Sequence, residues 1–341
     1  VDFPVRGPRP GPPAQPRDFQ YGTKDGYQFY LQGGSLMDLS RKYGLADNPY
    51  WMQNLEHTTY DDFWKARSIW RHFRDVAPAV LVVGGWFDAE DLMGPLRTFG
   101  TLRAESPKTT SHLVMGPWTH GGWSRGPGNQ VGKVQFGEAT GQFYREQVEH
   151  RFFEQHLRGV QGPAVPGVSV FETGANRWVT SDTWPPKSTS TSYYLGADGV
   201  LTASEPNDAN GFDEYVSDPA NPVPVVGEPA IGMPRDYMAS DQRFAARRPD
   251  VLVYKSAVLT EDVTVRGPIG VDLRVSTSGT DSDFVVKVID EYPAGAPNAG
   301  MQQLVRGEPF RGKFRKSLET PVPFTPNVPD TIRFDLPDVA H

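Results

Sequence analysis

The sequence of 341 residues is long enough for about two domains, because a domain usually holds roughly 100 to 200 residues. Its formal net charge of -7, with lysine and arginine scattered along the chain, argues against nucleic acid or an anionic membrane surface as the main partner. The sequence contains no cysteine, which excludes a disulfide framework, a thiolate nucleophile and a cysteine-ligated zinc site but leaves the cellular compartment open.

The chain starts with a proline-rich polar stretch, residues 1–20, that is typical of a loop or linker. Because this stretch has neither an initiator methionine nor a signal-peptide pattern, we expect the start to be internal to something longer. The next segment, from Ser35 to Phe73, carries apolar residues at mixed spacings of three and four, with turn signals at Gly44 and Asn48. This pattern predicts two or three helices.

A strand, a helix and a second strand are predicted next. The apolar run from Ala79 to Phe87 is typical of a strand buried on both faces of a parallel sheet, and it is too short for the roughly 20 residues of a membrane helix. An amphipathic helix is expected from about Glu90, and a second strand from Ser111 to Trp118. A single apolar stripe between Gly141 and Val160 predicts a further helix.

The rhythm of the sequence changes near residues 160–167, at a segment rich in glycine and proline. Beyond it, short alternating runs separated by turn residues predict an antiparallel sandwich or jelly roll. These runs are VSVFETG, TSYYLGADGVL, VLVYKSAVL, VTVRGPIGVDLRVSTS and DFVVKVIDEYP. The predicted fold class is therefore α/β over residues 1–165, followed by a β-sandwich over residues 166–341.

Two polar residues follow the two predicted parallel strands. Asp88 lies just past the carboxyl end of the first strand, where ligands bind in open α/β sheets, although its position equally suits a helix cap. His120 lies just past the second strand, so both side chains should emerge at the same rim of the sheet. A carboxylate can fix the tautomer of an imidazole, whose other nitrogen can then deprotonate a serine hydroxyl. The aspartate and the histidine thus follow successive strands in this order. This order favours a catalytic role for Asp88 and His120 over a purely structural role for a buried His120.

The serine of such a triad is expected on a tight turn of the form G-x-S-x-G between a strand and a helix, upstream of the aspartate. The nearest segments are GGSLM around Ser35 and GWSRG around Ser124. The first has no strand before it, and the second lies in the loop directly after His120. We therefore expect the nucleophile in a segment upstream of Val1.

Five segments together resemble the CocE/NonD family of serine hydrolases. They are PAVLVVGGWFDAEDL, LVMGPWTHGGW, FYREQVEHRFFEQHL, VFETGANRW and the strands around DSDFVVKVIDEYP, in the family's order. The resemblance implies an α/β-hydrolase fold with a helical cap, here residues 20–75, followed by a jelly roll that is incomplete at its C-terminal end. It also implies acyl transfer to water through an acyl-serine, with Asp88 as the triad aspartate and His120 as the triad histidine.

Expectations for ligands follow from the same segments. Trp86 and Trp123 are candidate substrate-binding residues, and the expected substrate is a small ester, an amide or a short peptide. No cofactor or metal is expected, because His112, His150 and His156 have no ligand spacing. No nucleic acid and no membrane span are expected, and a homo-oligomer is left open.

Two pairs of aspartates carry weaker hypotheses. Asp61 and Asp62 could anchor a substrate ammonium, although a solvated helix face is favoured. Asp281 and Asp283 could bind calcium, although an ordinary turn is favoured.

The alternative to a hydrolase is a non-catalytic binding module whose jelly roll holds carbohydrate or a partner protein. A third reading is an inactive fragment with an unpaired strand edge. Under the leading hypothesis the isolated chain is itself inactive, because it lacks the serine.

Overall fold

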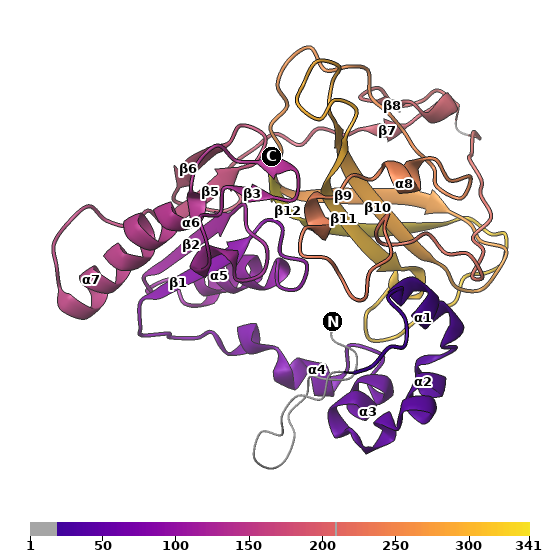
Figure 1. The fold of residues 1–341 in the computed structure, drawn as a ribbon, viewed down its shortest axis with the longest axis horizontal. Coiled ribbons are helices and arrows are strands. Elements are labelled where there is room, and N and C mark those ends of the chain that lie inside the picture. The colour runs from indigo at the N-terminus through magenta and orange to yellow at the C-terminus, as the bar shows by residue number, and fades with distance from the viewer. Residues whose placement is uncertain (1–18, 209) are drawn as a thin grey trace.

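The computed structural model describes residues 19–208 and 210–341. The loop predicted over residues 1–20 therefore lies almost wholly outside the described residues. Along the described chain a helical region comes first, a mixed α/β region second and a strand-rich region last, as Figure 1 shows. This order agrees with a helical cap, an α/β part and a sandwich.

The helical region contains α1, α2, α3 and α4, which run over Gly26–Gln32, Leu36–Tyr43, Pro49–Glu56 and Asp62–Arg67. Each helix is preceded by a residue whose side chain accepts a backbone N–H of the first turn, namely Asp25, Ser35, Asn48 and Asp61. The three helices α2 to α4 confirm the prediction made for residues 35–73. Helix α1 lies within the expected cap but was not predicted from the spacing of apolar residues, because its 7 residues are too few to show a helical period.

The helical region rests on the strand-rich region. The backbone N–H of Tyr60 donates to the carbonyl of Leu318 at 2.9 Å, and the ammonium of Lys65 lies 2.7 Å from the carboxylate of Glu319. These contacts place the end of the cap against the loop that precedes the last strand.

The α/β region is built on one sheet with strand order β1-β2-β5-β6. Strands β1 (Val80–Gly85) and β2 (Ser111–Gly116) are parallel and are joined through α5 (Met93–Glu105), which confirms the predicted strand-helix-strand unit. The helix starts later than the expected Glu90, because the residues after Asp88 form a separate turn.

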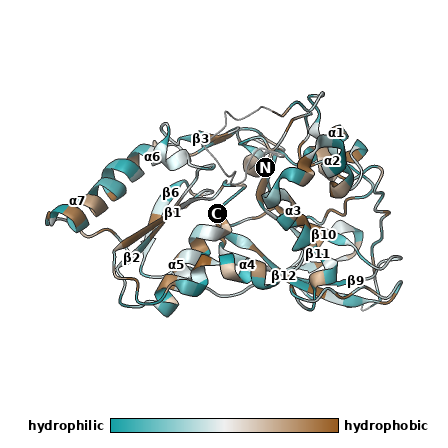
Figure 2. Cartoon of the chain, turned by 90° about the horizontal axis from the view of Figure 1, so that it is seen from below, coloured by the Kyte–Doolittle hydropathy of each residue, from teal (hydrophilic) through white to brown (hydrophobic). Residues whose placement is uncertain are grey.

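A long helical segment follows a small hairpin of β3 (Gln130–Val131) and β4 (Val134–Gln135). It consists of α6 (Thr140–Phe143), a π-helical stretch over Tyr144–Glu149 and α7 (His150–Arg158), as the apolar stripe predicts. Helix α7 projects from one end of the molecule and carries both hydrophobic and hydrophilic residues (Figure 2). Within the described part of the chain, no helix is both long and apolar enough to cross a bilayer.

The sheet of the α/β region continues past the boundary expected between residues 165 and 166. Strand β5 (Val168–Glu172) pairs in parallel with β2, and β6 (Arg177–Ser181) pairs with β5 in antiparallel fashion. The prediction that VSVFETG forms a sandwich strand is therefore wrong. Its alternating polarity suggested one exposed face, but the polar Ser169 is buried as fully as its apolar neighbours.

The sandwich region begins with a short hairpin and a long connection. Strands β7 and β8 (Tyr194–Leu195 and Leu201–Thr202) form the hairpin, and the short helix α8 (Arg243–Ala246) lies in the connection that follows. The segment VLVYKSAVL forms no strand and contributes one isolated bridge, between Val200 and Lys255. Its apolar residues are exposed, Val258 at 86% and Leu259 at 59%, so the strand predicted there is wrong.

Four long strands complete the sandwich region. They are β9 (Arg266–Val275), β10 (Asp283–Glu291), β11 (Gln302–Arg311) and β12 (Asp330–Ala340). Strand β10 pairs with β11 and β12 pairs with β9, both in antiparallel fashion, and β11 packs beside β12. The predicted class, an α/β sheet followed by a β-sandwich, is confirmed.

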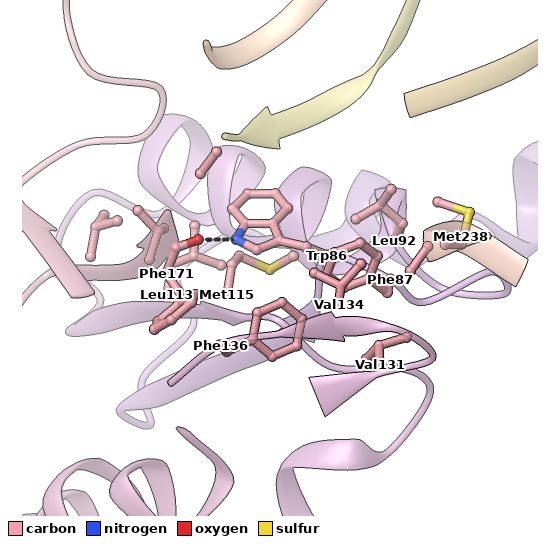
Figure 3. Packing of buried hydrophobic residues seen from close by; sticks show 14 of the residues in the cluster. Trp86, Phe87, Leu92, Leu113, Met115, Val131, Val134, Phe136, Phe171 and Met238 are labelled. Carbon is pink, nitrogen blue, oxygen red and sulfur yellow. Dashed lines mark hydrogen bonds between the residues drawn. The ribbon is translucent and has the colours of Figure 1, made fainter. Parts of the chain in front are cut away.

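The largest core cluster joins the two regions. It holds side chains of β1, α5, β2 and β5, and it also includes Met301 and Ala340 from the sandwich region. Trp86 lies at its centre, with its indole N–H directed at the carbonyl oxygen of Phe171 (Figure 3). The residues that follow β1 are therefore packed against both the α/β region and the sandwich region.

Candidate active site

Asp88 occupies a tight turn at the carboxyl end of β1. Its Oδ1 accepts the backbone N–H groups of Glu90 at 2.9 Å and Asp91 at 3.0 Å, and the residue is only 2% exposed. Since α5 starts at Met93, Asp88 does not cap that helix but stabilises the turn before it. These two donors compensate part of the cost of burying the carboxylate.

His120 lies beside Asp88, as the order of the two strands predicts. Its Nδ1 is 3.1 Å from Oδ2 of Asp88 and 3.4 Å from Oδ1. Half of the imidazole side chain is exposed, whereas the Asp88 carboxylate is buried. The pair thus has an inaccessible carboxylate and an accessible ring, an arrangement in which Asp88 can fix the tautomer of His120.

Main-chain hydrogen bonds hold the two loops together. The N–H of Trp86 donates to the carbonyl of Gly116 at 2.8 Å, and the N–H of Phe87 donates to the carbonyl of Trp118 at 3.0 Å. The pairing of β1 with β2 therefore continues beyond the strands, up to the residues that carry the functional groups.

Two glycines make this close approach possible. A Cβ on Gly85 would lie 2.2 Å from the carbonyl oxygen of Trp118, and a Cβ on Gly116 would lie 2.4 Å from the indole of Trp118. Gly121, with φ of 67°, turns the chain directly after His120 in a conformation that favours glycine. Two glycines of the sequence around His120, Gly116 and Gly121, thus have a structural reason.

The three tryptophans near the pair have different positions. Trp118 is buried and its indole N–H donates to Oγ1 of Thr140 at 2.8 Å, while Trp123 is partly buried with its ring 6.3 Å from that of Trp118. Trp86 is 2% exposed and its indole N–H donates to the carbonyl of Phe171, so its side chain lies in the core of the described structure, and its substrate role stays a prediction. A substrate role for Trp123 stays a prediction.

Two further acidic side chains surround His120. Oε2 of Glu90 lies 3.9 Å from Nε2 of His120, and Oδ2 of Asp91 lies 3.5 Å from Nδ1. Glu90 and Asp91 were not expected against His120 from the sequence alone. One signal in the sequence could have indicated this position. Glu90 and Asp91 lie two and three residues after Asp88, close enough to share a turn with it.

The same side chains have the spacing of a metal site. Ligand atoms of Asp88, Asp91 and His120 lie within 4.8 Å of one another, the only such group among the described residues. Carboxylate and imidazole ligands suit a divalent cation. Because Oδ1 of Asp88 already accepts two backbone N–H groups, a metal would compete with the turn for this carboxylate. The expectation of no metal stays a prediction.

The two candidate serines have structural roles. Oγ of Ser35 accepts the N–H of Asp38 at 3.1 Å and caps α2. The hydroxyl of Ser124 donates to the carbonyl of Gly121 at 3.0 Å within a short 3-10 turn, so no strand leads into it. Neither serine lies on a turn between a strand and a helix.

Comparison with known proteins identifies the family. Residues 17–122 match the model of the X-Pro dipeptidyl-peptidase (S15 family), and residues 163–341 match that of the X-Pro dipeptidyl-peptidase C-terminal non-catalytic domain. The chain is 32% identical over 283 residues to a cocaine esterase of Rhodococcus sp. (strain MB1 Bresler), covering 79% of this chain and 47% of the esterase. The chain belongs to the CocE/NonD family of serine hydrolases.

Solved structures agree with membership of the CocE/NonD family. An aminopeptidase from a marine sediment archaeon, Thaumarchaeota archaeon, superposes with a TM-score of 0.90 at 33% identity, covering 95% of this chain and 55% of that one. An α-amino acid ester hydrolase gives a TM-score of 0.90 at 35% identity, covering 96% and 56%. The chain thus spans about half the length of these relatives. Asp88 and His120 lie outside the segment that matches the non-catalytic domain.

Four of the remaining candidates contact groups away from the Asp88 and His120 pair. Oδ1 of Asp61 accepts the N–H of Phe63, and its Oδ2 lies 2.6 Å from Nδ1 of His57, a hydrogen bond that holds the pKa of Asp61 below its usual range. Asp281 and Asp283 face Lys313 at 3.8 Å and Arg311 at 3.2 Å. Opposing cations at both carboxylates favour the turn over a calcium site. His112 is bonded to the carbonyl of Pro166 at 2.9 Å.

Proposed function

We propose that this chain supplies the aspartate and the histidine of an acyl-transferring serine hydrolase, and that the serine is contributed by a segment upstream of Val1. The observation that carries the proposal is the 3.1 Å contact between Nδ1 of His120 and the buried Oδ2 of Asp88 at the ends of adjacent parallel strands. Membership of a serine hydrolase family supports the same assignment.

The proposed roles follow from the hydrogen bonds of the pair. With Nδ1–H donating to Asp88, Nε2 of His120 carries a lone pair and can take the proton of a serine hydroxyl as that oxygen attacks the acyl carbonyl. The imidazolium then returns the proton to the departing alcohol or amine, which leaves an acyl-serine. Water enters by the same sequence of proton transfers and releases the acid. Asp88 stays ionised and stabilises the imidazolium.

The acids next to His120 support a class of substrate. Glu90 and Asp91 place two exposed carboxylates within 4 Å of the imidazole nitrogens, where they would attract a cationic group on the acyl portion. Two of the similar structures are named an aminopeptidase and an α-amino acid ester hydrolase. We therefore assign esters or amides of α-amino acids as the favoured substrates.

Active-site labelling tests the proposal directly. A fluorophosphonate probe should leave the isolated chain unlabelled and should label a serine of the upstream segment once that segment is supplied. The matched variants are Ser124→Ala and Ser35→Ala, which should not change the labelling. Covalent modification of Ser124 or Ser35 in the isolated chain would contradict the assignment of an upstream nucleophile.

A further inference from the structure

One buried arginine of the sandwich region reaches across to the loop that carries Asp88. Arg306, on β11, is 2% exposed, and its guanidinium donates to the carbonyl oxygen of Trp86 at 3.0 Å. Its other terminal nitrogen donates to the carbonyl oxygen of Asp338 on β12 at 2.8 Å. Trp86 lies two residues before Asp88, so this bond joins the sandwich to the start of the Asp88 turn.

The position of Arg306 is costly for the sandwich itself. Both acceptors are neutral carbonyl groups rather than carboxylates, and Nε has no hydrogen-bond partner among the described residues. Burial accordingly lowers the pKa of Arg306 to about 10, opposed by the charges of Asp338 and Glu308. A buried charge that is not closely paired destabilises a fold, and a packed apolar side chain is often a better core residue. Core packing alone therefore gives no reason for a guanidinium here.

The bond from Arg306 is the third hydrogen bond that fixes Trp86. The N–H of Trp86 is held by the carbonyl of Gly116, its indole by the carbonyl of Phe171, and its own carbonyl by Arg306. Trp86 is thus tied to β2, to β5 and to the sandwich at the same time. The chain from Trp86 to Asp88 has little freedom left.

We propose that Arg306 is a positioning residue, which holds the carbonyl of Trp86 so that Asp88 stays in hydrogen-bond reach of His120. The inference rests on the proposed function of the Asp88 and His120 pair. It also gives the sandwich region a part in catalysis, although that region contributes no reacting group. Loss of the bond should let the Asp88 turn shift without unfolding the sheet.

The test compares Arg306→Lys and Arg306→Met with Arg315→Lys in the complete hydrolase that includes the serine segment. Arg315 is a matched control, because its side chain is only 4% exposed in the same region but is bonded to Asp330 rather than to the Asp88 loop. A misplacement of about 1 Å can cost about 10²-fold in rate, so Arg306→Met should lower kcat by about that factor and leave KM within about twofold. Arg306→Lys should lower kcat by about tenfold, because one ammonium cannot span both carbonyls.

Backbone amide NMR shifts give a second readout. If Arg306→Met does not fold, the shifts can still be measured in Arg306→Lys. Amide signals of residues 88–91 should move in Arg306→Lys and stay in Arg315→Lys. Equal kcat in the two lysine variants, or unmoved signals at residues 88–91, would overturn the inference. Full activity in His120→Ala would instead contradict the proposed function. The amide signals alone would then show whether Arg306 holds the Asp88 turn in place.

Discussion

The backbone N–H of Phe87 donates to the carbonyl oxygen of Trp118 at 3.0 Å, and this bond joins the two loops that present Asp88 and His120 at the point nearest to both residues. Phe87 immediately precedes Asp88, and Trp118 lies two residues before His120. The relative position of the carboxylate and the imidazole is thus set mainly by the backbone. If side chains alone set this position, rotamer changes would move the two groups out of the orientation that catalysis needs.

The substitution Gly85→Ala should disturb this bond. A Cβ at residue 85 would lie 2.2 Å from the carbonyl oxygen of Trp118, so the loops must separate to accommodate it. We expect the rate of ester hydrolysis by the complete enzyme to fall by about 10²-fold, because a small displacement of catalytic groups has effects of that order. Steady-state kinetics with circular dichroism as a folding check would measure it.

Gly94→Ala is the matched control for this substitution. Gly94 lies in α5 on the same connection, and a Cβ there would meet nothing within 4 Å. The control should keep full activity and the same or a higher melting temperature, since alanine favours helix over glycine. Equal activity of the two variants would show that the loops tolerate separation.

Asp88→Asn should remove most of the activity while leaving the fold intact. An amide can neither hold the correct tautomer of His120 nor stabilise its charged form, and the loss in a triad is about 10⁴-fold in kcat. Asp62→Asn, at a fully exposed position, serves as the control. A loss of only a few fold would refute the catalytic role of Asp88. Loss of the low-field Nδ1–H signal of His120 in proton NMR would report the broken bond independently.

The sequence predicts the proximity of Asp88 and His120 better than it predicts the strands around them. Asp88 and His120 each lie in the loop that follows an apolar strand, and two parallel strands joined by one helix place their carboxyl ends together. Strand β5 was assigned to the wrong sheet. Its alternating pattern predicts a strand but does not show that the strand pairs with β2. Arg306 and Trp86 are separated by 220 positions, so no local period or motif could have indicated their bond.

The carboxylates of Glu90 and Asp91 should determine the preference for amino-acid esters. Glu90→Gln and Asp91→Asn remove the charges that would attract an α-ammonium group. For each variant we expect KM for an α-amino ester to rise about tenfold, the loss of roughly one charged hydrogen bond, with KM for the matching ester without the amino group unchanged. A comparable rise in KM for both esters would point to damage of the turn instead.

Chelation should distinguish a serine hydrolase from a metal-dependent one at this site. Because the proposed mechanism uses only side chains, treatment with EDTA should leave the rate of the complete enzyme unchanged. Added Zn²⁺ should inhibit, since Asp88, Asp91 and His120 have the spacing to bind it and His120 would then be blocked. Asp91→Asn should weaken that inhibition. Loss of activity on chelation, restored by metal, would overturn the mechanism.

The stability of the sandwich region should depend on acid through Asp330. Its Oδ2 lies 2.7 Å from Nε of Arg315 and its Oδ1 lies 2.9 Å from Nζ of Lys316, and these hydrogen bonds hold the pKa of Asp330 well below its usual range. A depressed pKa in the folded state means that the contribution to stability is complete above the ordinary aspartate pKa of about 3.9 and is lost as the pH falls below it.

Asp330→Asn should therefore lower the melting temperature at pH 7, and the difference from the unmodified chain should shrink as the pH falls from 5 to about 3. Asp335→Asn, an exposed position on the same strand, is the control and should change the melting temperature little at any pH. Thermal unfolding followed by circular dichroism at several pH values measures both variants. A difference that stays constant down to pH 3 would mean that the charge of Asp330 does not stabilise the fold.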